Sequence, residues 1–233
     1  MILDPLNDGK SRIELIDSMG NDLSIVNDAR ASFDKVSQEL GSRDVKLIKY
    51  LIEHEHTSPF RGVTFKFKVK APLYIARQWW KHVVASSHDD EQLGWNEKSF
   101  RYVSTNDPDE FYIPHTFRKQ SVNNKQATSG ELTSFESLKS RFIYKTLCNL
   151  SYLGYQSLLK SGVGREMARG ILVPSVYTSW VWTTSLQSTL HFTHLRLGKG
   201  AQTEIGAYAE AVTSLIEPIV PATLAVFQEL NNK

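Results

Sequence analysis

The chain is poor in cysteine, because Cys148 is the only one among its 233 residues. A single thiol forms no intramolecular disulfide, and a disulfide-free chain is typical of a reducing compartment. The N-terminal segment 1–17 carries acidic residues early and lacks the basic and then apolar pattern of a secretory signal. We therefore expect a cytoplasmic protein.

Long apolar runs are also missing, and none approaches the roughly 20 residues that a membrane-spanning helix needs. The net charge is only +2, which provides no broad basic surface for nucleic acid. Hydrophobic residues make up 41% and charged residues 22% of the chain, as in ordinary globular proteins. We expect neither a membrane nor a nucleic acid as partner, so an anionic ligand must be held by local clusters of Arg and Lys.

Glycine-rich phosphate-binding motifs are absent as well, since the sequence contains neither G-x-G-x-x-G nor a P-loop. The predicted helices and strands alternate without a regular βαβ pattern. The expected fold class is α+β, with a mostly antiparallel sheet and surrounding helices in a single domain spanning residues 1–233. Any nucleotide must be bound in another way than on a Rossmann fold.

Hydrophobic periodicity is clearest at 63–70, where apolar residues alternate with Thr and Lys. This alternation predicts a strand with one face in the core and with Lys66, Lys68 and Lys70 on the solvent face. The other predicted strands are 12–17 and 176–184, and the stretches 86–98 and 116–130 are expected to be loops. The predicted helices are 21–31, 42–54, 72–84, 131–161, 165–172, 185–197, 202–216 and 222–230. The expected core contains Phe65, Phe67, Ile75, Trp79 and the long helix 131–161.

The segment after this strand gathers residue types that suit a nucleotide. It reads RQWWKHVV from Arg77 and, after a polar stretch, NEKSFRY from Asn96. The spacing of Gln78, Lys81 and His82 places all three on one stripe of the predicted helix. A guanidinium such as that of Arg101 or Arg169 suits a phosphate, because its planar fork binds two oxygens at once.

These segments resemble the signature of flavin-dependent thymidylate synthases, in which a helix bearing Arg-Gln-Trp and then Arg-His-Arg precedes Asn-Glu-x-Ser-x-Arg-Tyr. The resemblance covers most of the chain, from Arg12 to about Tyr208. It extends to MGNDLS at 19–24, ASF at 31–33, HEHTSPF at 54–60, FKVKAP at 67–72, REMAR at 165–169 and HLRLGKGAQTEI at 194–205. It implies conversion of dUMP to dTMP with FAD, NADPH and 5,10-methylenetetrahydrofolate, by a homotetramer with active sites shared between subunits.

The resemblance also implies which residues form the sites. Arg196 is the expected catalytic residue, because a cation beside the uracil ring stabilises negative charge that develops there. The expected contacts to dUMP are Gln78, Trp79, Trp80, Lys81, Glu97, Lys98, Ser99, Phe100, Arg101, Arg169 and Arg196. The expected contacts to the flavin are Ser58, Lys81, His82, Val83, Glu97, Ser185, Leu186, Gln187 and His191. The hydride itself is the chemistry of FAD.

The chain departs from the family pattern around the flavin. Lys81 stands in place of an arginine and loses the bidentate fork, and Val83 removes a second cation. Ser185 and His191 stand where the family usually has asparagine. The stretch between the helix and Ser99 is also longer than in the family. We hypothesise that its extra loop, at 87–94, takes over part of the missing contact to the flavin.

These departures leave two alternatives open. One is a related flavin enzyme that modifies a pyrimidine nucleotide with a different one-carbon outcome, such as hydroxymethylation. The other is a nucleic-acid-binding protein that has kept the fold and lost catalysis. Retention of Gln78, Arg101, Arg169 and Arg196 argues against such a loss.

Other residues receive plainer interpretations. Cys148 has no basic neighbour in sequence, which indicates a small core residue rather than a nucleophile. Ser99 also lacks a flanking base, so we expect it to bind rather than attack. No Cys pair accompanies the possible metal ligands, so no metal is expected from His54, His56, His191, His194 and the acidic run 89–91. Helical and strand spacing favours the core over a nucleic-acid stacking platform for Trp79, Trp80, Trp180 and Trp182.

Overall fold

The computed structural model of the chain describes residues 1–84, 94–105, 107–108 and 110–231. Its main sheet is antiparallel throughout, with the strand order β1-β2-β3-β7-β4. The fold class is therefore α+β, as the sequence predicted. The strands of this sheet are β1 (Ile2–Leu3), β2 (Arg12–Met19), β3 (Thr64–Pro72), β4 (Gly94–Glu97) and β7 (Tyr177–Ser185).

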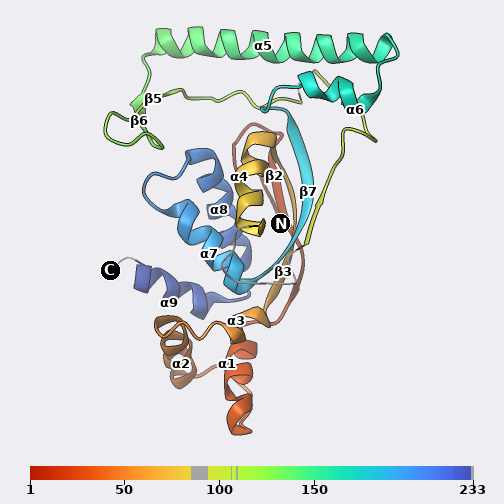
Figure 1. Cartoon of the computed structure of the whole chain (residues 1–233). Helices are drawn as coiled ribbons and strands as arrows, with labels where there is room; N and C mark the ends of the chain where they lie inside the picture. Colours follow the sequence, from red (N-terminus) through yellow and green to blue (C-terminus); the bar gives the residue numbers. More distant parts are fainter. Residues whose placement is uncertain (85–93, 106, 109, 232–233) are drawn as a thin grey trace.

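Helices cover one face of the sheet and both of its ends (Figure 1). Those on the face are α4 (Leu73–Val84), α7 (Leu186–Leu197) and α8 (Thr203–Ile216). Those at one end are α1 (Asp22–Arg30), the 3-10 helix η1 (Ala31–Phe33), α2 (Ser42–Glu53), α3 (Ser58–Arg61) and α9 (Pro221–Asn231). Those at the other end are α5 (Ser134–Lys160), α6 (Arg165–Ala168) and the 3-10 helix η2 (Arg169–Ile171).

Aromatic side chains fill the space between the sheet and its helices. Phe67 lies opposite Trp182 in the β3–β7 pair, and their rings stack 5.5 Å apart. Trp79 of α4 meets Trp182 edge-on at 5.1 Å and stacks on Phe192 of α7 at 4.4 Å. The predicted core residues Phe65, Phe67, Ile75 and Trp79 are all buried. The predicted solvent face is also present, although Lys70 on it forms an ion pair with Glu110 at 3.2 Å.

Three sequence predictions need correction at the level of secondary structure. The expected loop 86–98 ends in β4, where the ring of Trp95 stacks on Trp180 at 4.5 Å. The expected loop 116–130 contains a two-stranded hairpin of β5 (Arg118–Gln120) and β6 (Thr128–Glu131). Pro72 closes β3 instead of opening α4. Strands this short carry too few residues to show an alternating pattern.

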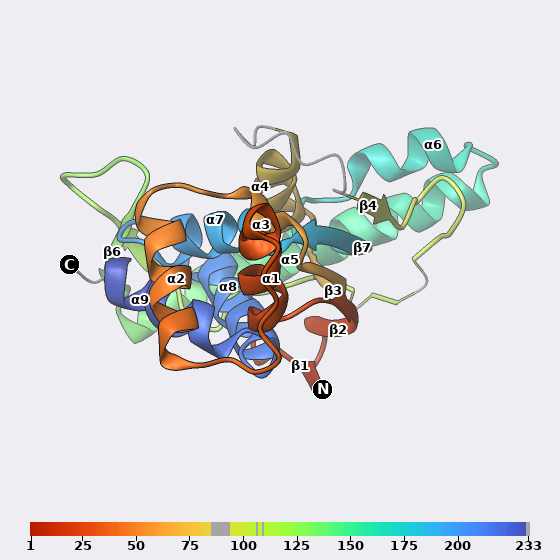
Figure 2. The same ribbon diagram turned by 90° about the horizontal axis from the view of Figure 1, so that it is seen from below.

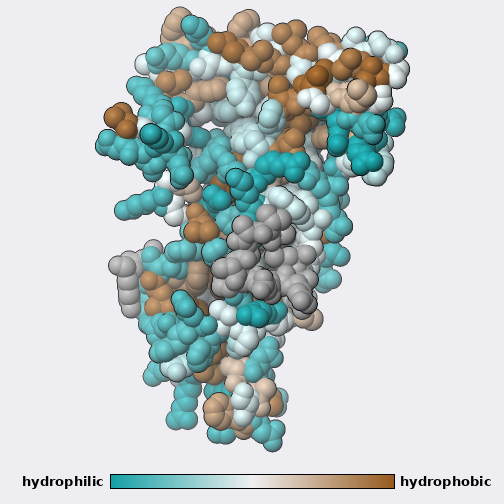
Figure 3. All heavy atoms as spheres, viewed as in Figure 1, coloured by the Kyte–Doolittle hydropathy of each residue, from teal (hydrophilic) through white to brown (hydrophobic). Residues whose placement is uncertain are grey.

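The prediction that the long helix lies in the core is wrong for the isolated chain. Within α5 only Cys148 and Tyr155 are buried, and they face the chain's own body. The opposite side carries a row of exposed apolar residues that forms a brown band over α5 in Figure 3. We call this row the α5 apolar face, and it consists of Phe135, Leu138, Phe142, Ile143, Leu147, Leu150 and Leu153. Apolar periodicity identifies a helix face that is stabilised by burial, but it does not identify the surface that covers that face.

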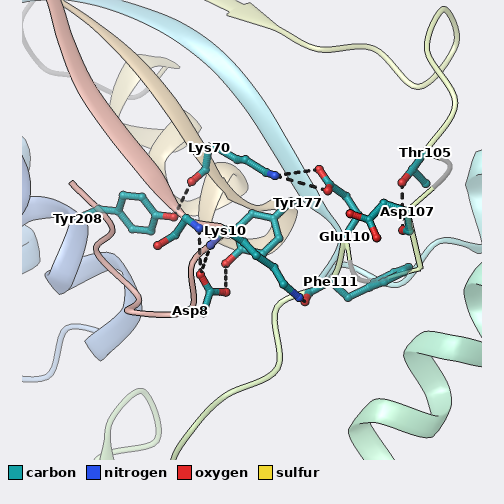
Figure 4. Close-up of polar contacts among 10 residues, drawn as sticks. Asp8, Lys10, Lys70, Thr105, Asp107, Glu110, Phe111, Tyr177 and Tyr208 are labelled. Atoms are coloured by element: carbon teal, nitrogen blue, oxygen red, sulfur yellow. Dashed lines mark hydrogen bonds and ion pairs between the residues drawn. The ribbon is translucent and has the colours of Figure 1, made fainter. Parts of the chain in front are cut away.

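Polar contacts join the β1–β2 loop, the sheet and the segment between β4 and α5 (Figure 4). Tyr177 of β7 donates its hydroxyl to Asp8 at 2.5 Å, and Lys70 of β3 pairs with Glu110. The backbone carbonyl of Phe111 accepts from Lys10 at 3.3 Å. The contacts of Glu110 and Phe111 anchor the chain about ten residues after the predicted substrate residues 97–101.

A buried carboxylate joins the two ends of the chain. Asp22, at the start of α1, accepts from the backbone N–H groups of Ala222 and Thr223 at 2.8 and 3.0 Å. It also accepts from the Thr223 hydroxyl at 2.5 Å, so it serves as the N-terminal cap of α9 from 200 residues away in sequence. Negative charge at this position is favoured, because the first N–H groups of a helix have no partner within it.

We predict that Asp22→Ala lowers the free energy of unfolding by about 2 kcal/mol, because the first turn of α9 loses its buried acceptor. Urea denaturation measures this change through the transition midpoint. Glu39→Ala, in an exposed loop, is the matched control and should leave the midpoint unchanged. Equal midpoints for the two variants would contradict the capping role.

Candidate functional site

The centre of the candidate site is a contact between α4 and α7. Arg196 of α7 donates its Nε–H to Nε2 of His82 on α4 at 2.7 Å. The contact requires Nε2 of His82 to carry no proton, so the imidazole is neutral and protonated on Nδ1. The ring of His82 also packs edge-on against Phe192 at 5.3 Å and lies 6.1 Å from the ring of His191. Core packing therefore holds the acceptor in place.

The surroundings keep His82 neutral. Burial lowers its pKa from 6.5 to about 4, and the nearby Arg196 cation and His191 act in the same direction. Over the physiological range the imidazole therefore acts as a hydrogen-bond acceptor for Arg196 rather than as a second cation.

Arg196 is a half-buried cation, and no anionic side chain of the described residues lies beside it. Among the described residues, no Asp or Glu oxygen lies within 4.0 Å of its guanidinium. Burial lowers its pKa, which reflects the free-energy cost of holding a charge away from water. An incoming ligand with an anionic or strongly polarised oxygen would relieve that cost.

Gln78 lies one helical turn before His82 on the same side of α4. Its Nε2 donates to Oε1 of Gln202, which directly precedes α8. Gly206 lets α8 approach the end of α7, since a Cβ there would lie 3.3 Å from the carbonyl oxygen of Arg196. Gln78, His82 and Arg196 thus lie on adjoining parts of α4 and α7, and their roles in binding stay predictions. Gln202 was not predicted, although it falls in the matching segment 194–205.

A cavity of about 550 Å³ opens on the other side of α7, between α2, α3 and α9. Gln187 lines it with only 6% of its surface exposed. Its Oε1 accepts from Nε of Arg61 at 2.9 Å, whereas its buried Nε2 has no hydrogen-bond partner in the described part of the chain. Such an unpaired buried donor is costly unless a ligand accepts from it. The remaining lining is Leu51, Ile52, Glu55, Thr57, Phe60, Leu190, His191, His194, Phe227 and Asn231.

The other predicted flavin residues occupy varied positions. Ser185 is buried and caps α7, since its hydroxyl accepts from the backbone N–H of Ser188 at 3.2 Å. Leu186 is part of the core, and Ser58 opens α3 beside the cavity with an exposed side chain. Lys81 is exposed, and the side chain of Val83 lies outside the described part of the chain, as does most of the inserted loop 87–94.

The predicted substrate strip 97–101 follows β4. Glu97 accepts from the Thr178 hydroxyl at 2.9 Å and from Nε1 of Trp95 at 3.2 Å. Phe100 is buried in a small cluster with Phe111, Cys148 and Val176. This anchor leaves Arg101 exposed, with its guanidinium 5.7 Å from the ring centre of Tyr102. Lys98 lies over the Phe100 ring at 5.2 Å, and Ser99 is half-buried.

The structure does not bring all the predicted substrate residues together within one chain. Arg169 is exposed at the start of η2 and donates its Nε–H to the carbonyl oxygen of Glu166 at 3.3 Å. In both views α6, which directly precedes η2, lies beside α5 and away from α7 (Figures 1 and 2). Arg169, which is predicted to bind the phosphate, therefore lies at a different place on the chain from the group around Arg196.

The tryptophan and cysteine residues follow the plainer interpretations, whereas the acidic run 89–91 lies outside the described residues. Trp79 is fully buried, so its indole serves the core, and Trp80 is half-buried against Trp95 at 5.4 Å. Burial raises the pKa of the Cys148 thiol, whose sulfur lies 3.4 Å from the Ser175 hydroxyl.

Within the described ranges, no three His, Cys, Asp or Glu side chains gather closely enough to hold a metal ion. No helix in those ranges has the length and apolar character to cross a bilayer.

Solved structures share this arrangement of strands and helices. Two of them are the UMP/dUMP methylase PolB from Streptomyces cacaoi, bound with 5-Br UMP and with 5-Br dUMP. They superpose with TM-scores of 0.81 and 0.80 at 26% sequence identity, and the first comparison covers 94% of each chain. In fold, the chain falls in the structural class of this methylase.

Sequence comparison identifies the family. The model described as "Thymidylate synthase complementing protein" matches residues 14–222. A flavin-dependent thymidylate synthase from Thermus thermophilus is 41% identical over 94% of this chain and 76% of its own length. One from Thermosipho melanesiensis is 38% identical over 95% and 92%, respectively. The chain belongs to the flavin-dependent thymidylate synthase family, as its motifs predicted.

The lowered pKa of His82 predicts a pH dependence of stability. Between pH 6.5 and about 4 the unfolded chain binds a proton on this residue that the folded chain does not. Stability contributed by neutral His82 is therefore lost as pH falls through this window and is present above it. His82→Gln retains an acceptor for Arg196 but has no proton to gain.

We expect His82→Gln to lose less stability than the wild type between pH 6.5 and 4.5. Urea denaturation of both proteins across this range measures the difference in slope. Parallel pH profiles would show that the imidazole is not held neutral by the fold.

Proposed function

We propose that this protein converts dUMP to dTMP with FAD as its flavin cofactor. The observation that carries the proposal is the half-buried Arg196 cation, which pairs with no carboxylate of the described residues and which neutral His82 orients one helical turn from Gln78. The names of the relatives and the nucleotides bound by the solved methylase support the same substrate class. The chain acts as one domain over residues 1–233.

Arg196 stabilises charge on the pyrimidine. Activation of C5 of the ring transfers electron density toward the ring oxygens, and a guanidinium beside them stabilises that charge. Because Nε is already occupied by His82, the terminal N–H groups of Arg196 remain for the ligand. Cys148 takes no part as a nucleophile, since its thiol is buried and its pKa is raised. Arg101 and Arg169 bind the phosphate, with Ser99 and Lys98 beside it, and Trp80 and Lys81 complete the substrate site.

The cavity beside α7 fits part of a flavin cofactor. Its apolar walls suit a planar ring system, and Nε2 of Gln187 supplies a buried donor for a carbonyl or ring nitrogen. His191 lines the cavity, Ser58 lies on α3, which borders it, and the ring of His82 lies 6.1 Å from that of His191. FAD, when bound and reduced, supplies the hydride. NADPH is the proposed reductant, and methylenetetrahydrofolate the proposed one-carbon donor.

We predict that the FAD-loaded protein oxidises NADPH in a manner that depends on dUMP. Arg169→Ala should raise the dUMP concentration for half-maximal oxidation at least about tenfold, because a charge-assisted phosphate contact is lost. Arg165→Ala, an exposed arginine of the adjacent helix, is the matched control and should change it little.

Product analysis by mass spectrometry then identifies the outcome. dTMP is the expected product, whereas 5-hydroxymethyl-dUMP would favour the alternative one-carbon chemistry. No flavin binding and no effect of dUMP would contradict the proposed function. A parallel reaction with UMP tests whether the 2′-hydroxyl is accepted.

We further propose that the active sites are shared between subunits of a homotetramer. The α5 apolar face is exposed in the single chain, and such a continuous face is typical of a subunit interface. The separation of Arg169 from Arg196 has the same explanation, and in the proposed assembly a second copy brings its strip 97–101 to the group on α4 and α7. The interface and the divided site therefore require the same assembly.

Mixed oligomers test this sharing directly. Arg101→Ala and Arg196→Ala should each be nearly inactive alone, whereas co-expressed chains should regain dUMP-dependent NADPH oxidation, because some sites then receive both intact arginines. Phe142→Glu, on the α5 apolar face, should lower the mass measured by light scattering, whereas Lys145→Glu nearby should not. Mixed chains without recovered activity would show that each site belongs to one subunit.

A further inference from the structure

A chain of hydrogen bonds leads from the candidate site to a buried ion pair. Gln78 donates to Oε1 of Gln202, and Nε2 of Gln202 donates to Oε2 of Glu204 at 2.9 Å. The other carboxylate oxygen of Glu204 accepts from Arg118 of β5 at 2.6 Å. The side chain of Glu204 is only 5% exposed, so the chain of contacts ends inside the protein.

Each contact in this chain has one permitted direction. An ionised carboxylate accepts hydrogen bonds and donates none, and both Arg118 and Gln202 donate to Glu204. Gln202 must therefore turn its NH₂ group toward Glu204, which turns its Oε1 toward Gln78. Gln78 in turn must offer its NH₂ group to Gln202. Its Oε1, which has no partner among the described residues, is then left for a ligand.

The position of Gln202 supports a role beyond holding the helix. It occupies the N-cap of α8, where Ser, Thr, Asp or Asn normally bond the first N–H groups. Its side chain makes no such bond and instead connects Gln78 with Glu204. The contacts converge on the buried carboxylate of Glu204, and a polar group that has lost water is costly unless it is hydrogen-bonded.

We propose that Gln202 and Glu204 are positioning residues that fix the amide of Gln78 with its oxygen toward the nucleotide. This inference rests on the proposed function, in which Gln78 contacts dUMP. A fixed acceptor selects a ligand with an N–H or O–H donor at that point and rejects one with an acceptor there. An amide free to rotate by 180° accommodates both. Two groups of dUMP supply a donor, namely N3–H of the uracil ring and the 3′-hydroxyl of the sugar.

Glu204→Gln tests the inference, because an amide at this position donates as readily as it accepts and no longer imposes a direction. Arg118→Gln is the matched control, since it removes the same ion pair but keeps the carboxylate that orients Gln202. Both variants lose the ion pair between β5 and α8, so a purely structural role would affect them alike. Their melting temperatures check that both are folded.

Binding of dUMP, dCMP and 2′,3′-dideoxyuridine 5′-monophosphate to the FAD-loaded proteins is then measured by calorimetry. Cytosine carries a lone pair where uracil carries N3–H, and the dideoxy nucleotide lacks the 3′-hydroxyl. We expect Glu204→Gln to reduce roughly tenfold either the preference for dUMP over dCMP or the preference for dUMP over the dideoxy nucleotide. A tenfold change in affinity corresponds to the free energy of about one hydrogen bond. Arg118→Gln should keep both. A change against dCMP assigns N3–H as the donor, and a change against the dideoxy nucleotide assigns the hydroxyl.

Unchanged preferences in Glu204→Gln would overturn the positioning role. Equal changes in Glu204→Gln and Arg118→Gln would also overturn it, in favour of a structural ion pair. A wild-type protein that binds none of the three nucleotides would instead overturn the proposed function.

Discussion

The pairing of β3 with β7 is the interaction on which the rest of the structure depends. The two strands are antiparallel from Thr64 opposite Ser185 to Pro72 opposite Tyr177, and each passes directly into a helix. Because the strands run in opposite directions, α4 and α7 leave from opposite ends of the pair and pack on the same face. Trp79 and Phe192 stack where these helices meet, and one turn further along α4 His82 reaches Arg196. The central polar contact of the site is therefore a product of hydrophobic packing.

The site holds polar groups away from the water that would otherwise form hydrogen bonds with them. Among the described residues, Arg196 is partly desolvated without a carboxylate beside it, and Gln187 buries an N–H group without a hydrogen-bond partner. Each arrangement reduces the stability of the empty fold, and each is relieved by a ligand group of complementary chemistry. The stability comes from elsewhere, from the aromatic core and from the Asp22 contacts that join α1 to α9.

Much of this organisation was predictable from sequence, and the exceptions have physical causes. Alternation at 63–70 and the i, i+4 spacing of Gln78 and His82 are local signals, so β3 and the polar side of α4 were found. The contacts of Gln202 with Gln78 and of Asp22 with α9 join residues distant in sequence, and no local pattern encodes them. Helix α5 shows the opposite case. Its apolar periodicity is evident in the sequence, but the surface that would bury the α5 apolar face is not part of the single chain. The motifs identified the family because they span most of the chain in order, whereas the division of the substrate residues became visible only in three dimensions.

The aromatic core has a consequence for how the protein can be observed. All five tryptophans of the chain lie in one connected set, in which Trp80 contacts Trp95, Trp95 stacks on Trp180, and Trp79 touches both Trp180 and Trp182. Helices α1, α2, α5 and α9 contain none. Tryptophan fluorescence therefore reports on the sheet and α4 alone. Fraying of the peripheral helices leaves the emission unchanged, whereas a disturbance beside His82 and Arg196 changes it.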